Sequence, residues 1–327
     1  MNKTPLASIV VITYNQQESL PKTLDSLLCQ KTGFPFEIVV GEGCSTDKTS
    51  DVLRDYASRF PDIIKPIFNE SNKGILGNYV STLSRCQGKY IADCAGDDYW
   101  NDDEKLQVQV DVMEGNPEIG LVYTDVNVDS VVTQQKFVRK CEDPQDELFT
   151  QLLRGNPIVA PTVCYRSSLL KHVDFDEFQK QGFIMEDYPL WLTFSLYTRF
   201  YHINKPTITY RIERGFINDP KAVSLHAIKF DEGTTAVRLY FLRKYPNETN
   251  LTENEILDAH NKMGYMAGLN MNDRLFTLKY VSQMHNRNPY VRRLTTMSKS
   301  RLLYGLYQMY RNLTGKKRTA LQMYFGQ

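Results

Sequence analysis

The sequence is poor in the residues that zinc sites and disulfide frameworks need. Its 327 residues include five histidines and six cysteines, and HxxxH, HExxH and CxxC spacings do not occur. A zinc site is therefore not expected, and without a signal peptide the cysteines are typical of reduced thiols in a cytosolic protein. No apolar run reaches the roughly 18 residues that a membrane span requires. We expect a soluble protein, or one attached at most to a membrane surface.

Glycine-rich phosphate loops are also missing. The first apolar run is followed by the polar segment TYNQQESL, which contains no GxGxxG. This absence argues against a dinucleotide oxidoreductase. A nucleotidyltransferase usually carries a glycine-rich, basic loop at the same place, so that enzyme class is kept only as an alternative.

Acidic residues are absent from the end of the chain. Eleven of the 39 Lys and Arg residues, but none of the 38 Asp and Glu residues, lie after Asp273. Such asymmetry indicates a basic surface for an anionic partner. An amphipathic stretch at 302–313 either rests on an anionic membrane surface or belongs to a core or dimer face. Its aromatic residues follow helical spacing, which is not the stacking platform of a nucleic-acid-binding protein.

Strand and helix patterns alternate along most of the chain. An apolar run typical of a strand buried on both faces of a sheet occurs at residues 6–13. Further strands are expected at residues 36–40, 63–68, 89–94 and 119–124. Helical spacing fills the intervals, so we expect a doubly wound α/β sheet with right-handed crossovers in residues 1–220. Residues 221–327 are expected to form a helical, basic extension. Two helix starts are also expected, one capped by Ser45 or Thr46 and one by a capping box of Asn101 and Glu104.

Two adjacent carboxylates stand just after the fourth expected strand, in the segment GDDYW at residues 96–100. Ligands of doubly wound sheets bind beyond the carboxyl ends of the strands. Adjacent carboxylates at such a place can hold a divalent cation, which usually also holds phosphates. The alternative is a solvated turn that leads into the next helix.

Three segments in order carry a more specific signal: SIVVITYNQQESLPKTLDSLLCQ, FEIVVGEGCSTDKT and NKGILGNYVSTLSRCQGKYIADCAGDDYW. Together they resemble family two of the inverting glycosyltransferases over residues 6–110, with a weaker match to about 215. The resemblance implies a GT-A Rossmann-like mixed sheet, a nucleotide-sugar donor and Mn²⁺ or Mg²⁺. It also implies a hexosyl- or hexosaminyl-transferase, with a UDP-sugar as the expected donor.

The resemblance assigns roles by position. The residues implied to bind the nucleotide sugar are Thr13, Tyr14, Asn15, Glu42, Asn72, Gly74, Asn78, Asp97 and Asp98. Asp98 is also the implied metal ligand. Glu42 departs from the Asp-Asp that the family more often has, and Ala95 replaces an acidic residue that some members carry. A turn for Tyr14 and Asn15, and a helix start for Asn72 and Gly74, are the structural alternatives.

A second acidic pair, Glu186-Asp187, lies in an apolar and aromatic stretch. Burying charge is costly, so the pair should line a cavity or find partners. The resemblance implies that Asp187 is the catalytic base and that Glu186 orients it or the acceptor. The alternative is a favourable charge at a helix N-terminus.

The family further implies a glycan or lipid-linked acceptor and a role in cell-surface polysaccharide synthesis. A lipid-linked acceptor would place a cytoplasmic protein at the inner face of the plasma membrane. A non-catalytic nucleotide-sugar-binding protein of the same fold remains the alternative from another class. Composition and spacing leave the oligomeric state open.

Overall fold

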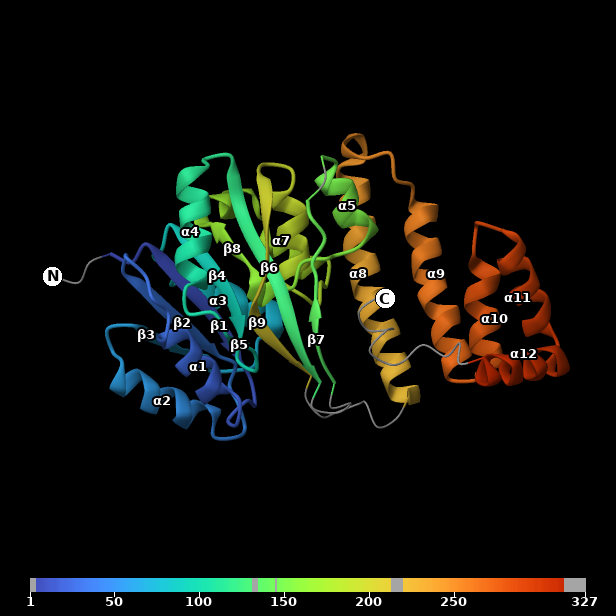
Figure 1. The fold of residues 1–327 in the computed structure, drawn as a ribbon, viewed down its shortest axis with the longest axis horizontal. Coiled ribbons are helices and arrows are strands. Elements are labelled where there is room, and N and C mark those ends of the chain that lie inside the picture. The colour runs from blue at the N-terminus through green and yellow to red at the C-terminus, as the bar shows by residue number, and fades with distance from the viewer. Residues whose placement is uncertain (1–3, 131–134, 145, 213–219, 315–327) are drawn as a thin grey trace. The chain divides into compact units, whose positions relative to one another are not determined.

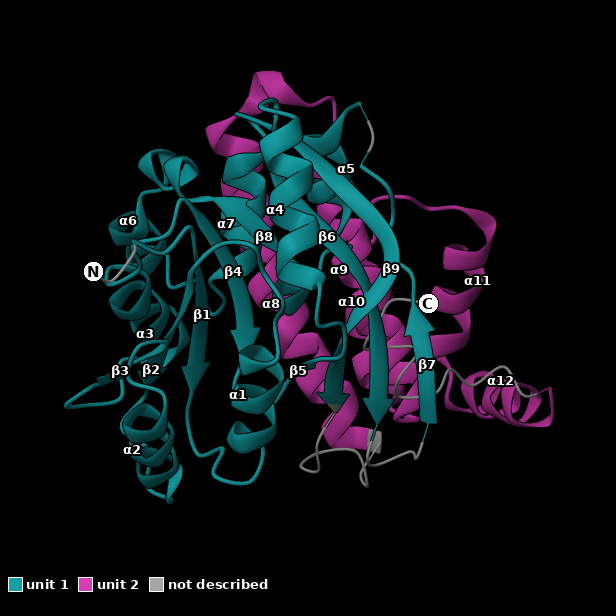
Figure 2. Ribbon diagram, turned by 60° about the vertical axis from the view of Figure 1, so that its left-hand side comes forward, with its two compact units in different colours: residues 1–213 teal, residues 214–327 magenta. Residues whose placement is uncertain are grey.

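The computed structural model describes residues 4–130, 135–144, 146–212 and 220–314. The chain forms two compact units, residues 1–213 and 214–327 (Figures 1 and 2). The first holds the sheet, and the described part of the second is helical. Among the described residues, no helix combines the length and the apolar character needed to cross a membrane.

The first unit is built on one mixed sheet in the order β3-β2-β1-β4-β8-β6-β9-β5, with β7 paired to β6. Strands β1 to β4 are parallel, β8 is antiparallel to its neighbours, and β9 runs parallel to β6. The bounds of the strands are Ala7–Thr13 (β1), Phe36–Glu42 (β2), Ile64–Phe68 (β3), Tyr90–Ala95 (β4), Tyr99–Trp100 (β5), Ile119–Ser130 (β6), Gln135–Arg139 (β7), Cys164–Arg166 (β8) and Arg199–Ile212 (β9). The expected α/β class and the strands expected at all five places are confirmed.

Helices pack against the sheet and bury its apolar side chains. Their bounds are Leu20–Leu28 (α1), Thr49–Arg59 (α2), Gly74–Leu83 (α3), Lys105–Gly115 (α4), Leu148–Arg154 (α5), Phe175–Lys180 (α6) and Asp187–Phe194 (α7). Apolar side chains of α1, α2 and α4 join those of β1, β2 and β4 in one buried core. Helix α3 approaches β2 so closely that a Cβ on Gly41 would lie 1.9 Å from the hydroxyl of Thr82. Glycine is therefore the residue that this approach allows.

The described part of the second unit contains α8 (Pro220–Lys244), α9 (Glu253–Asn270), α10 (Arg274–Gln283), α11 (Pro289–Lys299) and α12 (Arg301–Leu313). It has a hydrophobic core of its own, to which Tyr265, Leu269 and Leu294 contribute. The amphipathic stretch expected at 302–313 lies within α12.

Both expected helix caps are wrong. Helix α2 begins at Thr49 without a side-chain cap, because the hydroxyl of Ser45 accepts a hydrogen bond from the backbone of Asn15 instead. Helix α4 begins at Lys105, also without a side-chain cap, so Asn101 and Glu104 form no capping box. In both places the candidate capping residues belong to the loop that precedes the helix.

Candidate active site

The loops that follow β1 and β2 are joined by hydrogen bonds. The side-chain oxygen of Asn15 accepts from the backbone of Thr46 at 2.8 Å, and the backbone of Gln16 donates to the hydroxyl of Thr49 at 2.8 Å. Asn15 and Cys44 both adopt left-handed backbone conformations, with φ of 53° and 63°. The two loops therefore form one fixed edge at the carboxyl ends of neighbouring strands, and Tyr14 lies on it 44% exposed.

Glu42 organises the second of these loops. Its buried carboxylate accepts from the backbone of Ser45 at 2.8 Å, the backbone of Cys44 at 3.2 Å and the hydroxyl of Ser50 at 2.9 Å. These three donors hold the carboxylate at the end of β2. A contact to a nucleotide base, as the resemblance implies for Glu42, would be made in addition to them.

Thr13, the last residue of β1, carries a polar atom that lacks a partner. Its hydroxyl oxygen is buried and forms no hydrogen bond in the described part of the chain. The neighbouring Gly96 leaves space beside it, because a Cβ there would lie 2.8 Å from this oxygen and 2.4 Å from the side-chain oxygen of Gln16. A buried polar group without a partner is costly, and it is often explained by a ligand.

The GDDYW turn is fastened to α1. The hydroxyl of Thr23 contacts the carbonyl oxygens of Gly96 and Asp98 at 3.0 and 2.6 Å, and the hydroxyl of Ser26 accepts from the backbone of Trp100 at 3.0 Å. The carboxylate of Asp98 is buried and accepts from the backbone of Arg211 at 3.1 Å. The turn is therefore held from α1 on one side and from β9 on the other.

A divalent cation fits this corner with few protein ligands. No group of three or more His, Cys, Asp or Glu side chains suited to a metal occurs among the described residues. Magnesium-type sites, however, often use one or two carboxylates together with substrate phosphates and water. Asp98, with Asp97 beside it and the unpartnered hydroxyl of Thr13 across Gly96, offers the oxygen donors that such an ion prefers.

Asn72, Gly74 and Asn78 lie at the start of α3. The side-chain oxygen of Asn72 accepts from the backbone of Gly74 at 2.8 Å, and Gly74 has a φ of 71°. Asn78 is buried, donates to the carbonyl of Gly41 at 2.9 Å and accepts from Asn69 at 2.8 Å. These contacts match the structural alternative of a helix start, and the binding role stays a prediction.

Glu186 and Asp187 open α7, and both are partly exposed. Surrounding protein raises the pKa of both carboxyl groups, and the charge of Asp187 raises the pKa of Glu186 further. A third carboxyl group, Asp93 of β4, interacts with them electrostatically. Burial and then the charge of Asp187 raise the pKa of Asp93 to about 7, while the hydroxyl of Tyr79, at 3.0 Å, opposes this shift. The acidic pair of α7 therefore lies within electrostatic range of the strand that leads to the GDDYW turn.

Sequence reasoning missed Asp93 and also Lys105. The Lys105 ammonium is buried, donates to the side chain of Gln109 at 2.8 Å and lies 3.8 Å from the centre of the Trp100 ring. Burial lowers its pKa to about 8. For Asp93 the available signal was a charged residue inside the apolar run YIADCA, whereas Lys105 follows DDE and gives no such signal.

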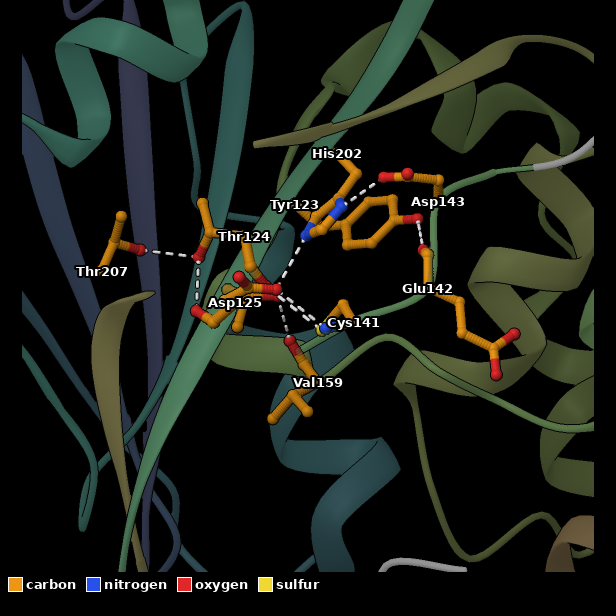
Figure 3. Close-up of polar contacts among 10 residues, drawn as sticks. Tyr123, Thr124, Asp125, Cys141, Glu142, Asp143, Val159, His202 and Thr207 are labelled. Carbon is orange, nitrogen blue, oxygen red and sulfur yellow. Dashed lines mark hydrogen bonds and ion pairs between the residues drawn. The ribbon is translucent and has the colours of Figure 1, made fainter. Parts of the chain in front are cut away.

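A second polar cluster, also missed, connects β6, β9 and the segment after β7 (Figure 3). The ring nitrogens of His202 lie 2.9 Å from a carboxylate oxygen of Asp125 and 2.6 Å from one of Asp143. Asp125 is buried and also accepts from the backbone of Cys141 at 2.8 Å. A neutral imidazole has one N–H, so only the imidazolium form donates to both carboxylates. The cluster is a structural tie between elements far apart in the sequence.

One of two cavities lies away from the candidate site, and the other borders the GDDYW turn at Trp100. One, of about 780 Å³, is in the second unit beside Asp258 and His285, and the other, of about 470 Å³, lies beside Cys29 and Asp103. Neither is lined by Asp98 or Asp187. The candidate site therefore rests on the placement of its side chains at the strand ends.

A family model described as glycosyl transferase family 2 matches residues 8–173, half of the chain. The chain belongs to glycosyl transferase family 2. This match includes the TYN segment, Glu42 and the GDDYW turn, and it ends before Glu186. The membership and the fold together confirm the resemblance.

Relatives of this family 2 chain include proteins with and without a stated activity. The uncharacterized protein Rv1520 of Mycobacterium tuberculosis is 40% identical over 121 residues, which are 37% of this chain and 35% of that protein. The chain thus spans about a third of the length of the first relatives it matches. WfaP of Escherichia coli, named a UDP-Glc:alpha-D-GlcNAc-diphosphoundecaprenol beta-1,3-glucosyltransferase, is 29% identical over 189 residues, covering 57% of this chain and 69% of WfaP.

Solved structures support the GT-A fold of family 2. TarS 1-349 of S. aureus in complex with UDP superposes with a TM-score of 0.51 at 19% identity, over 98% of this chain and 92% of that one. The mannosyltransferase PcManGT of Pyrobaculum calidifontis, in complex with GDP-Man and Mn²⁺, gives a TM-score of 0.56 at 16% identity, over 96% and 88%. At these identities the likeness concerns the fold.

Proposed function

We propose that this chain transfers a sugar, with inversion, from a nucleoside-diphosphate sugar to an acceptor hydroxyl. The observation that carries the proposal is the GDDYW turn, which holds two adjacent carboxylates after β4 and whose Gly96 lies against the unpartnered buried hydroxyl of Thr13. Family membership supports the reaction class. The complexes of TarS with UDP and UDP-GlcNAc support a UDP-sugar as the donor.

The donor would lie along the joined loops after β1 and β2. Thr13, Tyr14 and Asn15 form the first loop, and the exposed ring of Tyr14 is available to stack on a base. The other residues proposed to contact the donor are Glu42, Asn72, Gly74, Asn78, Asp97 and Asp98. Asp97 would contact the ribose, and Asp98 would hold the cation.

Mn²⁺ or Mg²⁺ on Asp98 would neutralise the charge that develops on the departing diphosphate. The complex of PcManGT with GDP-Man and Mn²⁺ supports a divalent cation in this fold. The chain's own contribution is to hold the Asp98 carboxylate still. The backbone of Arg211 donates to this carboxylate, and the hydroxyl of Thr23 holds the backbone carbonyl of the same residue.

Asp187 would accept the proton of the acceptor hydroxyl while the acceptor oxygen bonds to the anomeric carbon and the bond to the diphosphate breaks. A base is most effective when its pKa lies near the working pH, and the surroundings of Asp187 raise its pKa in that direction. Glu186 would orient Asp187 or the acceptor. Placing both substrates together supplies a further part of the rate.

The acceptor is proposed to be a glycan or a lipid-linked sugar of cell-surface polysaccharide synthesis. The name of WfaP, which includes a diphosphoundecaprenol acceptor, supports this class. A lipid-linked acceptor would be met at an anionic membrane surface, to which the basic C-terminal region would be attracted. The protein would then work as a cytoplasmic, peripheral enzyme at the inner face of the plasma membrane.

One experiment tests the proposal. Purified protein with Mn²⁺ is screened against UDP-, GDP- and dTDP-sugars for donor hydrolysis and for protection against thermal unfolding. We expect Asp98→Asn to abolish metal-dependent protection, and Asp187→Asn to keep protection but lose hydrolysis. The matched control is Asp129→Asn, which removes a carboxylate of β6 paired with Lys136. Full activity in both site variants would refute the roles assigned.

The same screen decides against the alternatives. Protection by a nucleotide sugar without turnover in wild type, under all acceptor conditions, would favour a non-catalytic binding protein. Release of inorganic pyrophosphate from a nucleoside triphosphate would favour a nucleotidyltransferase.

A further inference from the structure

Helix α12 turns its apolar side chains outward. Leu302, Leu306, Met309 and Leu313 are spaced by four, three and four residues, which places them on one side of the helix. Their exposed fractions are 72, 54, 61 and 85%. Surface helices usually bury their apolar side, so the polarity of α12 is the reverse of the usual one.

The side of α12 that packs against the rest of the second unit combines the ring of Tyr304, which belongs to the core, with hydrogen-bonded polar groups. Tyr304 and Gln308 are buried there, and the side chain of Gln308 donates to the carbonyl of Leu269 at 2.9 Å. The hydroxyl of Tyr304 lies 2.9 Å from that of Thr277. Turning the leucines inward would break these bonds and leave buried polar groups without partners. The outward orientation is therefore built into the packing of the unit.

Exposed positive charge occurs in the same part of the chain. The exposed residues Arg292, Arg293, Lys299 and Arg301 lie on α11 and at the start of α12. No Asp or Glu occurs after Asp273. A second copy of the same surface would bring like charges together, which disfavours self-association. Exposed leucines on α12, together with exposed arginines and lysines of α11 and α12, match a bilayer that combines acyl chains with anionic headgroups.

We propose that α12 lies in the headgroup layer of an anionic membrane, with Leu302, Leu306, Met309 and Leu313 toward the acyl chains. The proposal deepens the membrane partner named under the proposed function. It concerns only the second unit and its test uses no substrate. A failure of donor binding would consequently leave this proposal intact, and a failure of membrane binding would leave the catalytic roles intact.

The test is cosedimentation of the full chain with vesicles. One set contains phosphatidylcholine alone, and the other contains roughly a third phosphatidylglycerol. We expect binding to the anionic set, weakened by salt. The double variant Leu302→Ser/Leu306→Ser should lower the partition coefficient about tenfold or more, because two leucines that enter the membrane in wild type are removed. The matched control is Leu275→Ser, which alters a 65% exposed leucine of α10.

A charge variant separates the contribution of the basic side chains from that of the leucines. Arg293→Gln/Arg301→Gln should weaken binding to the anionic vesicles, and circular dichroism checks that all variants keep the helical content of wild type. Absence of binding to anionic vesicles would overturn the proposal, as would equal binding by wild type and the double leucine variant. A dimer that dissociates in the leucine variant, without vesicle binding, would assign this surface to a second copy of the chain instead.

Discussion

At Asp93, a carboxyl group lies buried in β4 with the hydroxyl of Tyr79 as a hydrogen-bond donor. Its pKa is raised from the ordinary value to about 7, first by burial and then by the charge of Asp187, although the Tyr79 hydrogen bond opposes the shift. The folded protein therefore binds a proton that the unfolded chain releases between about pH 4 and pH 7. The contribution of Asp93 to the free energy of unfolding is therefore largest below about pH 4, and it is lost as the pH rises to about 7.

Asp93→Asn removes this titration while keeping an acceptor for Tyr79. Between about pH 4 and pH 7, the free energy of unfolding of the variant should rise relative to that of wild type by about 1.4 kcal/mol per pH unit, which is the slope for one proton. Urea unfolding at several pH values measures the difference. Parallel stability curves for the two proteins would mean that Asp93 does not carry this proton.

Along α1 and just after it, the side chains at positions 23, 26 and 30 form a polar stripe against the chain around the GDDYW turn. Thr23 and Ser26 contact the turn itself, and Gln30 donates to the carbonyl of Asp102 and accepts from the backbone of Leu106. The helix that follows β1 thereby positions the carboxylates that follow β4. This is how an element remote from Asp98 in the sequence contributes to the site.

Thr23→Val tests this link between helix and turn. The substitution keeps the shape and removes the hydroxyl, leaving two buried carbonyl oxygens without that donor, so we expect a loss of about 1–3 kcal/mol in unfolding free energy. Metal-dependent donor affinity should fall by about tenfold, because the backbone of the turn that carries Asp98 loses a hydrogen-bond donor. Thr23→Ser restores the hydroxyl and should restore donor affinity. Equal donor affinity in the valine and serine variants would show that the hydroxyl does not position the turn.

The strands that could be predicted are β1 to β4 of the parallel half and the first part of β6. Burial favours apolar residues there, and most residues of β1, β2, β4 and β6 are buried, whereas β3 is mostly only partly buried. The strands β5, β7, β8 and β9 could not be predicted, for a physical reason. Strand β8 has three residues and its place depends on neighbours, and β9 pairs with β6 through register shifts that tertiary contacts set.

The same distinction applies to the polar residues of the candidate site and of the His202 cluster. Asp98 and Asp187 could be proposed from local motifs. His202 and Asp125 could not, because they are 77 residues apart in the sequence and their pairing depends on the fold.

At the scale of the whole molecule, the two units differ in what they would bind. Every residue proposed for donor binding and catalysis belongs to residues 1–213, which enclose a hydrophobic core without any residue of the second unit. The described helices of the second unit have their own core and carry the exposed leucines of α12. Chemistry and membrane attachment should therefore be separable.

A chain that ends at residue 213 tests this separation. Because its core is self-contained, it should unfold cooperatively and keep Mn²⁺-dependent protection by a nucleotide sugar, with a Kd within about threefold of the full chain. It should also lose cosedimentation with anionic vesicles, since α12 is removed. Isothermal titration and the vesicle assay, run side by side on both chains, measure the two properties. Retained vesicle binding would place the membrane surface in the first unit, whereas lost donor binding in a folded fragment would mean that the second unit contributes to the donor site.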